Sequence, residues 1–298
     1  QILESHGFEV KLVNARHVKN VPGRKTDVSD CQWLQRLHTY GLLSGSFRPE
    51  DSICVLRSFW RHRDTLIRYA SSHVQHMQKA LTEMNIQLHK VISDITGLTG
   101  MRIIRAILTG ERDLVTLAHM RDPRIKSSTE QIAKALEGDD KREPLFALQQ
   151  AVELYDVYQQ KIQACDQQIE QYLTQLDSKI DLESNPLPAS TKSNKGPKGN
   201  APHFDLRTHL YRISGVDFTQ IDGLDVVSVH TILSEVGLDP AAFHTEKHFC
   251  SWLGLSPNNR ITGGRIKSSK TRKVINRATS AFRMAAQSLT YSSSALGG

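Results

Sequence analysis

Two aspartates, Asp27 and Asp30, have the residue type and spacing that suit a divalent cation. Thr26 just before them is a good N-cap, so the sequence predicts that a helix begins here. Aspartates three residues apart share one helix face, and Mg²⁺ takes one or two protein carboxylates together with water and phosphate oxygens. The alternative is an acidic first turn that only favours the helix dipole. Apolar positions at helical spacing support the helix: Trp33, Leu34, Leu37 and Tyr40.

Basic side chains gather at the other end of the chain. Residues 247–298 contain nine Lys and Arg and no Asp or Glu, whereas the whole chain has a formal net charge of +7, so the part before them is slightly acidic. A local basic surface is typical of proteins that bind a phosphate backbone. A solvated basic face without a partner is the alternative. The nine are Lys247, Arg260, Arg265, Lys267, Lys270, Arg272, Lys273, Arg277 and Arg283.

Thr262 is the candidate nucleophile of this basic region. It directly precedes Gly263 and Gly264, where a substrate can approach the backbone closely, and a basic helix is expected over 271–289. A hydroxyl, a flexible backbone and cations together suit attack on a phosphodiester. A tight turn before a DNA-binding helix is an equally good interpretation. Gly223 belongs to another glycine turn, of the kind that approaches phosphates in helix-hairpin-helix proteins, and ordinary entry into a helix accounts for this turn equally well.

The remaining patterns predict a mostly helical chain. Residues 8–14 alternate like a strand and, with the helix that ends near Gly41, resemble the end of an α/β unit whose other strands would precede Gln1. Apolar heptads over 60–95 and 145–180 predict two long helices in an antiparallel, coiled-coil hairpin, for dimerisation or for plain packing within one chain. Residues 184–203 have the composition of a linker. The expected division is therefore 1–50, an arm over 51–183, the linker, and a C-terminal helical domain over 204–298.

Composition excludes some classes of protein. No apolar run reaches the roughly 20 residues that span a bilayer, and there is no signal pattern, so we expect a cytosolic protein. The four cysteines have neither disulfide nor metal-ligand spacing. Because the chain begins with Gln and ends just after a helical pattern, truncation at both ends is expected.

Several separate blocks, in the same order, make the chain resemble the insertion-sequence 110 family of DEDD transposases, in the subgroup with a Trp-Leu-Gly-Leu-x-Pro motif. The resemblance implies a RuvC-like domain of the RNase H type at the N-terminus, a helical arm and a C-terminal transposase domain. The blocks are residues 25–30, 94–100, 110–113, 221–223, 251–257, 263–264 and 285–289.

The resemblance also implies roles for single residues. In the family four acidic residues bind Mg²⁺, and Asp27 and Asp30 resemble the third and fourth. A serine before the glycine pair joins covalently to DNA in the family. Here that position is Thr262, which keeps the hydroxyl but adds a methyl group that crowds attack; Ser256 is a distant alternative. The implied partners are transposon-end and target DNA, a guide RNA, and further copies in a dimer or tetramer, within the nucleoid of the cytoplasm.

The resulting hypothesis is a Mg²⁺-dependent transposase. Asp27 and Asp30 bind the metal, Thr262 attacks the scissile phosphate, and Gly223 and the basic side chains contact DNA. Two alternatives stay open, namely a catalytically inactive nucleic-acid-binding remnant and a RuvC-like junction nuclease that uses metal-activated water. The basic residues expected at the DNA backbone are Arg265, Lys267, Lys270, Arg272, Lys273 and Arg277.

Overall fold

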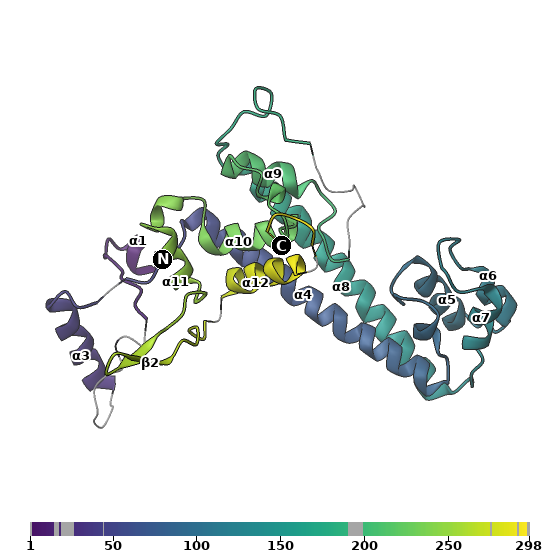
Figure 1. Cartoon of the computed structure of the whole chain (residues 1–298). Helices are drawn as coiled ribbons and strands as arrows, with labels where there is room; N and C mark the ends of the chain where they lie inside the picture. The colour runs from purple at the N-terminus through teal and green to yellow at the C-terminus, as the bar shows by residue number, and fades with distance from the viewer. Residues whose placement is uncertain are drawn as a thin grey trace. The chain divides into compact units, whose positions relative to one another are not determined.

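The computed structural model is mostly helical, as predicted, and divides into two compact units, residues 1–50 and 51–298 (Figure 1). Each unit is described by itself. The structure describes residues 2–14, 18, 27–43, 45–189, 199–274, 276–290 and 292–296.

The first unit contains the short helix α1 (Ile2–Ser5) and the helix α3 (Asp27–Thr39). The strand predicted over 8–14 is wrong: the only pairing there is a bridge between Val13 and Gly45, because no described strand lies beside it to extend the ladder. Burial among the described residues of this unit is confined to Pro49. The predicted cap Thr26 lies outside the described residues.

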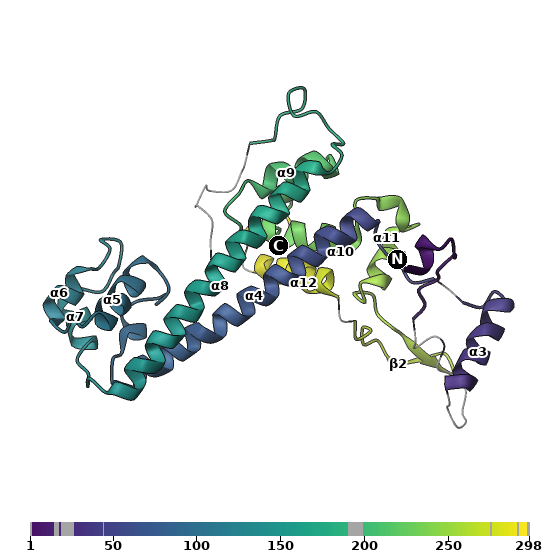
Figure 2. The ribbon, with the colours of Figure 1, turned by 180° about the vertical axis from the view of Figure 1, so that it is seen from behind.

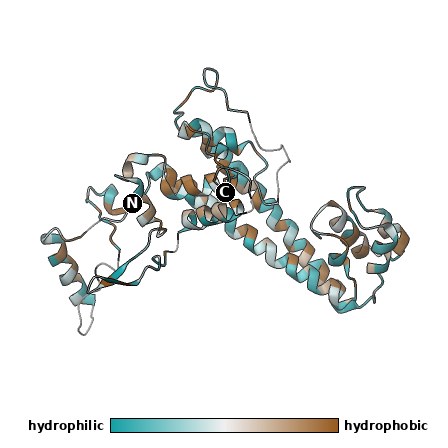
Figure 3. Ribbon diagram, viewed as in Figure 1, coloured by the Kyte–Doolittle hydropathy of each residue, from teal (hydrophilic) through white to brown (hydrophobic). Residues whose placement is uncertain are grey.

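Two long helices, α4 (Asp51–Glu83) and α8 (Arg142–Gln175), lie side by side and antiparallel, as predicted, and form an arm (Figures 1 and 2). Figure 3 shows hydrophobic and hydrophilic residues alternating along both helices. The first helix ends twelve residues before the predicted position at 95, because Asn85 has a left-handed backbone (φ 60°) and turns the chain. A supercoil of the two helices stays a prediction.

The chain between the two arm helices folds into a cluster of short helices at one end of the arm. Leu88, Ile103 and Ile132 are buried here against Met77 of α4 and Leu148 of α8, and we call these buried residues the tip core. The apolar positions that continued the heptad pattern past residue 83 therefore pack inside this cluster rather than along a helix. Its elements are η1 (Leu88–Lys90), α5 (Leu98–Leu108), α6 (Leu114–His119) and α7 (Thr129–Ala135).

The other end of the arm shares a second core, the base core, with the C-terminal helices. Trp60 of α4 and Ile169 of α8 are buried in one apolar cluster with Leu210, Leu233 and residues of α12. The segment 184–203, predicted as a linker, therefore does not separate two cores. Its residues 190–198 lie outside the described ranges. The C-terminal elements are α9 (Leu206–Ser214), η2 (Phe218–Gln220), α10 (Val226–Val236), η3 (Pro240–Ala242), α11 (Glu246–Trp252) and α12 (Arg277–Leu289).

Between α11 and α12 the chain forms a two-stranded antiparallel ribbon, β1 (Arg260–Thr262) and β2 (Arg265–Ser268). Thr262 pairs with Arg265, so Gly263 and Gly264 alone make the turn, with φ of 57° and 74°. Two consecutive left-handed residues form the hairpin turn that matches the twist of the strands, and glycine adopts this conformation without strain.

Candidate nucleic-acid interface

The acidic pair lies where the sequence predicted it, in the first turn of α3. Asp27 and Asp30 are both exposed, and no described side chain forms an ion pair with either. Two free carboxylates one turn apart can bind a hard cation that keeps several water ligands. Within the described ranges, no three His, Cys, Asp or Glu side chains gather as a metal site.

Thr262 lies at the end of the basic ribbon, one residue from the turn. Because it is paired directly with Arg265, the Thr262 hydroxyl and the Arg265 guanidinium belong to neighbouring side chains on the same face of the ribbon. Both residues are exposed. A phosphate that reached the hydroxyl would therefore lie beside a cation able to bind two of its oxygens.

The predicted basic helix over 271–289 is partly wrong, because α12 begins only at Arg277, where the side chain of Asn276 caps the helix by accepting from the Ala278 amide. Before it, Thr271 forms a bridge with Pro257, and residues 272–274 belong to neither a helix nor a strand. The cations of the ribbon and of this segment are exposed and have no ion pair with a described carboxylate. They are Arg260, Arg265, Lys267, Lys270, Arg272 and Lys273.

Arg277 differs from the other predicted DNA contacts. Its guanidinium Nη1 donates to Asp64 Oδ2 on α4 at 2.6 Å, and both side chains are about one-third exposed. The pair joins the start of α12 to the arm. Its charge is therefore already balanced within the protein, and a contact with DNA stays a prediction.

The glycine of the Trp-Leu-Gly-Leu-x-Pro motif explains how the ribbon is attached. Gly254 has a φ of 67°, and a Cβ at this position would overlap the side chain of Val274. Leu253 beside it is buried, and its carbonyl accepts from the Thr279 hydroxyl of α12 at 2.6 Å. The motif thus packs the end of α11 against the chain that follows the ribbon.

Gly223 has a packing role in this structure. It has a φ of 83°, and a Cβ there would lie 2.8 Å from the Ala285 carbonyl oxygen of α12. The close approach of the turn to α12 requires glycine, and a phosphate contact at Gly223 stays a prediction.

Two family models match the chain at its two ends. A model of DEDD transposases matches residues 1–86, and a model described as the transposase IS116/IS110/IS902 family matches residues 217–296. The two occur in the predicted order and together cover more than half of the sequence. The chain belongs to the IS110 transposase family. No curated protein and no solved structure matches it.

In this IS110-family chain, polar contacts that the sequence did not predict join the two arm helices to each other and α4 to α10. Arg63 of α4 forms a buried ion pair with Asp166 of α8, and its guanidinium lies 5.1 Å from the Trp60 ring. Arg61 donates to both Glu235 oxygens on α10 at 2.6 to 2.9 Å. Buried charges need such partners, but partners 103 and 174 residues apart in sequence leave no local pattern.

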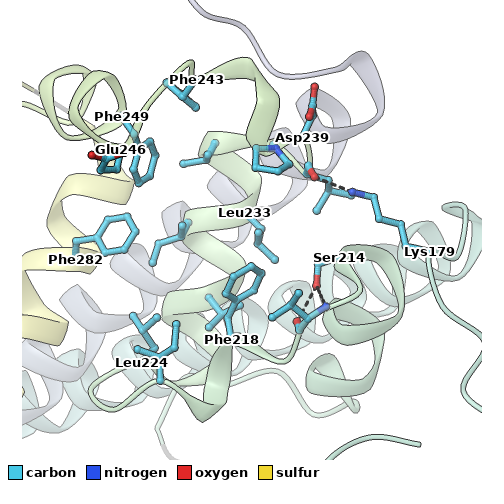
Figure 4. A pocket seen from close by; sticks show the side chains of 18 of the residues that line it. Lys179, Ser214, Phe218, Leu224, Leu233, Asp239, Phe243, Glu246, Phe249 and Phe282 are labelled. Carbon is cyan, nitrogen blue, oxygen red and sulfur yellow. Dashed lines mark hydrogen bonds between the residues drawn. The ribbon is translucent and has the colours of Figure 1, made fainter. Parts of the chain in front are cut away.

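The unit formed by residues 51–298 also contains a hydrophobic cavity of about 550 Å³ (Figure 4). Phe218, Leu233, Phe249 and Phe282 line it from separate elements. At its edge, Lys179 Nζ donates to the Leu238 carbonyl at 2.7 Å and the Ser214 hydroxyl donates to the Val216 carbonyl at 2.9 Å. Its lining is mainly apolar, which does not provide the converging polar groups that phosphoryl transfer needs.

The site residues of this IS110-family member thus fall into two groups. Thr262, Arg265 and Lys267 lie together on one ribbon, whereas Asp27 and Asp30 belong to the other compact unit. The described part of the chain has no helix both long and apolar enough to cross a membrane.

Proposed function

We propose that this IS110-family chain is a DNA-recombining transposase in which Thr262 is the nucleophile and the basic ribbon binds DNA. The observation that carries the proposal is the exposed Thr262 beside its cross-strand partner Arg265, at the turn of a ribbon that has no acidic residue. The matches to two transposase models support the substrate class.

The chemical step is a transesterification. The Thr262 oxygen forms a bond to phosphorus, the bond from phosphorus to one neighbouring nucleoside oxygen breaks, and that oxygen takes up a proton as the threonine hydroxyl loses one. Arg265 neutralises charge on the non-bridging oxygens as the phosphorus becomes five-coordinate. The protein–DNA ester preserves the reactivity of the phosphate, so a hydroxyl of another strand can attack it and release Thr262.

Asp27 and Asp30 are the residues that would hold Mg²⁺. Their exposed carboxylates fit a cation that keeps several waters. When bound, the ion would neutralise phosphoryl oxygens and bring substrate into line with the nucleophile. The two carboxylates themselves attract the ion and remain available because no described cation competes for them.

The partners proposed are transposon-end and target DNA and a guide RNA, the last resting on the family alone, in a homodimer or homotetramer within the cytoplasm. Exchange of four DNA ends favours an even number of copies.

Covalent capture of DNA tests the nucleophile. End-labelled DNA incubated with the protein and Mg²⁺ should give an adduct that survives denaturing electrophoresis. Thr262→Ala should lose it while binding in a mobility-shift assay is unchanged, and Thr262→Ser should keep it because the hydroxyl remains. Asp27→Asn should also lose the adduct without loss of binding. An adduct that persists in Thr262→Ala would exclude Thr262 as the nucleophile.

A second candidate function is nucleic-acid binding without catalysis. The observation that favours it is the threonine itself, because its methyl group crowds the hydroxyl where the family has serine. In that case the wild-type protein gives no adduct, yet its affinity falls steeply with salt concentration, as expected for a basic ribbon that displaces counterions.

A further inference from the structure

The face of the ribbon opposite Thr262 carries two exposed isoleucines. Ile261 and Ile266 are direct cross-strand partners, so their side chains lie together on one face, and each is 61% exposed. Thr262 and Arg265 are the adjacent pair and therefore point to the other face. An apolar pair left this exposed on a short ribbon marks a contact surface rather than part of the core.

The charge around this isoleucine pair indicates what it contacts. Arg260 and Lys267 flank it along the strands, further cations follow in 270–273, and residues 247–298 contain no carboxylate side chain. A second copy of the ribbon would bring the same positive charge and be repelled. A DNA duplex instead offers apolar base faces between two rows of phosphates, which match an apolar pair within a ring of cations.

We propose that Ile261 and Ile266 insert at a base step of duplex DNA and unstack it when the ribbon enters a groove. This inference rests on the proposed DNA binding by the ribbon and adds how the ribbon deforms its substrate. A two-stranded ribbon is narrow enough for a groove, and the Gly263-Gly264 turn keeps its end small. Side chains of this kind act as wedges in proteins that kink DNA.

The wedge also fits the reaction. Strand exchange requires that bases leave their original partners, and unstacking next to the scissile phosphate begins this separation. The isoleucine pair and the Thr262–Arg265 pair occupy opposite faces of the same ribbon. Insertion of the isoleucines therefore sets the depth at which Thr262 and Arg265 meet the DNA backbone.

A duplex that carries 2-aminopurine, a fluorescent base brightened by unstacking, provides the test. At saturating protein, the wild type should raise the fluorescence several-fold. The double variant Ile261→Ser/Ile266→Ser should lose this rise. Met284→Ser on α12, where the side chain is 65% exposed, is the matched control and should behave as the wild type. Because both isoleucines are exposed, the variant should keep the wild-type helix content in circular dichroism.

A second measurement separates unstacking from simple adhesion. The double variant should bind an intact duplex about tenfold more weakly than the wild type, while the two should differ little on a duplex with a mismatched, already unstacked step. An equal loss on both duplexes, a fluorescence rise that survives in the variant, or a change of oligomeric state in sedimentation would overturn the wedge. If the wild type binds DNA without unstacking it, only this inference fails. If it does not bind DNA, the proposed function fails as well.

Discussion

Acidification should destabilise the base core through the buried imidazole of His230 on α10. This side chain is fully buried, its ring centroid lies 4.1 Å from that of Trp60, and neither of its ring nitrogens has a described hydrogen-bond partner. Burial, assisted by the positive charge of Arg63, lowers the pKa of His230 from 6.5 to about 3. The folded protein therefore holds His230 as the neutral imidazole between pH 5 and pH 7.

The sign and size of the effect follow from proton linkage. Between pH 7 and pH 5 the unfolded state gains a proton on His230 and the folded state does not, so the free energy of unfolding falls as the pH falls. For a pKa of 6.5 in the unfolded state and about 3 in the folded state, the loss from pH 7 to pH 5 is about 2 kcal/mol. Asp217, whose burial is outweighed by hydrogen bonds from Arg207, Thr219 and Gln220 and whose pKa is about 2, titrates below this range.

Urea unfolding of the wild type and His230→Leu at pH 7, 6 and 5 is the assay. Leucine has a similar volume and no polar atoms, so the variant lacks the pH dependence that His230 gives to the wild type. The free energy of unfolding of the variant, relative to that of the wild type, should therefore rise by about 2 kcal/mol from pH 7 to pH 5. His62→Leu, which removes an exposed histidine from α4, is the control and should follow the wild type. If His230→Leu and the wild type lose stability in parallel, the buried neutral imidazole is not the cause.

Three further changes test the packing described above. Asp166→Asn leaves Arg63 buried without its carboxylate partner and should lower the free energy of unfolding in urea by about 3–5 kcal/mol. Replacing Arg63 by Met and Asp166 by Leu together should restore most of this stability. An unchanged urea midpoint for the single variant would contradict the role of the pair. Gly254→Ala should cost about 1–3 kcal/mol and lower the Tm, because its Cβ meets Val274 on left-handed backbone; a Tm within one degree of the wild type would argue against this contact. Amides of α3 should exchange with deuterium orders of magnitude faster than those of α4, since α3 has no buried residue; equal protection would show that α3 is covered in solution.

Local signals predicted the elements well. Aspartate is a favoured N-cap residue, and the side chain of Asp225 caps α10 by accepting from the Ser228 amide. The helix after Thr26 ends at Thr39, close to the expected Gly41. In each case the signal consists of a cap, an apolar spacing and a glycine, all within about fifteen residues.

Long-range contacts limited the rest of the prediction. The apolar spacing over 60–95 predicted a helix longer than α4. Leu88 and Ile95 fit that spacing because they are buried, but they are buried in the tip core and not along α4. The start of α12 was misplaced because Thr271, where the helix was expected to begin, pairs instead with Pro257, fourteen residues earlier in the chain. The pairing of Thr262 with Arg265 was not predicted, although two adjacent glycines between β-forming residues are a hairpin signal and would have indicated it.

Division of the arm between two cores has a practical consequence for engineering. The outer half of the α4–α8 pair folds with the short helices at its end, and the inner half folds with the C-terminal helices. A chimaera that exchanges arms between relatives should therefore be spliced midway along both helices, near Ala70 and Ile162, which are buried but belong to neither core, so that each parental half keeps its own core. A crossover placed between residues 184 and 203 would instead divide the base core between two parents, because α8 contributes to it from one side of that segment and α9, α10 and α12 from the other.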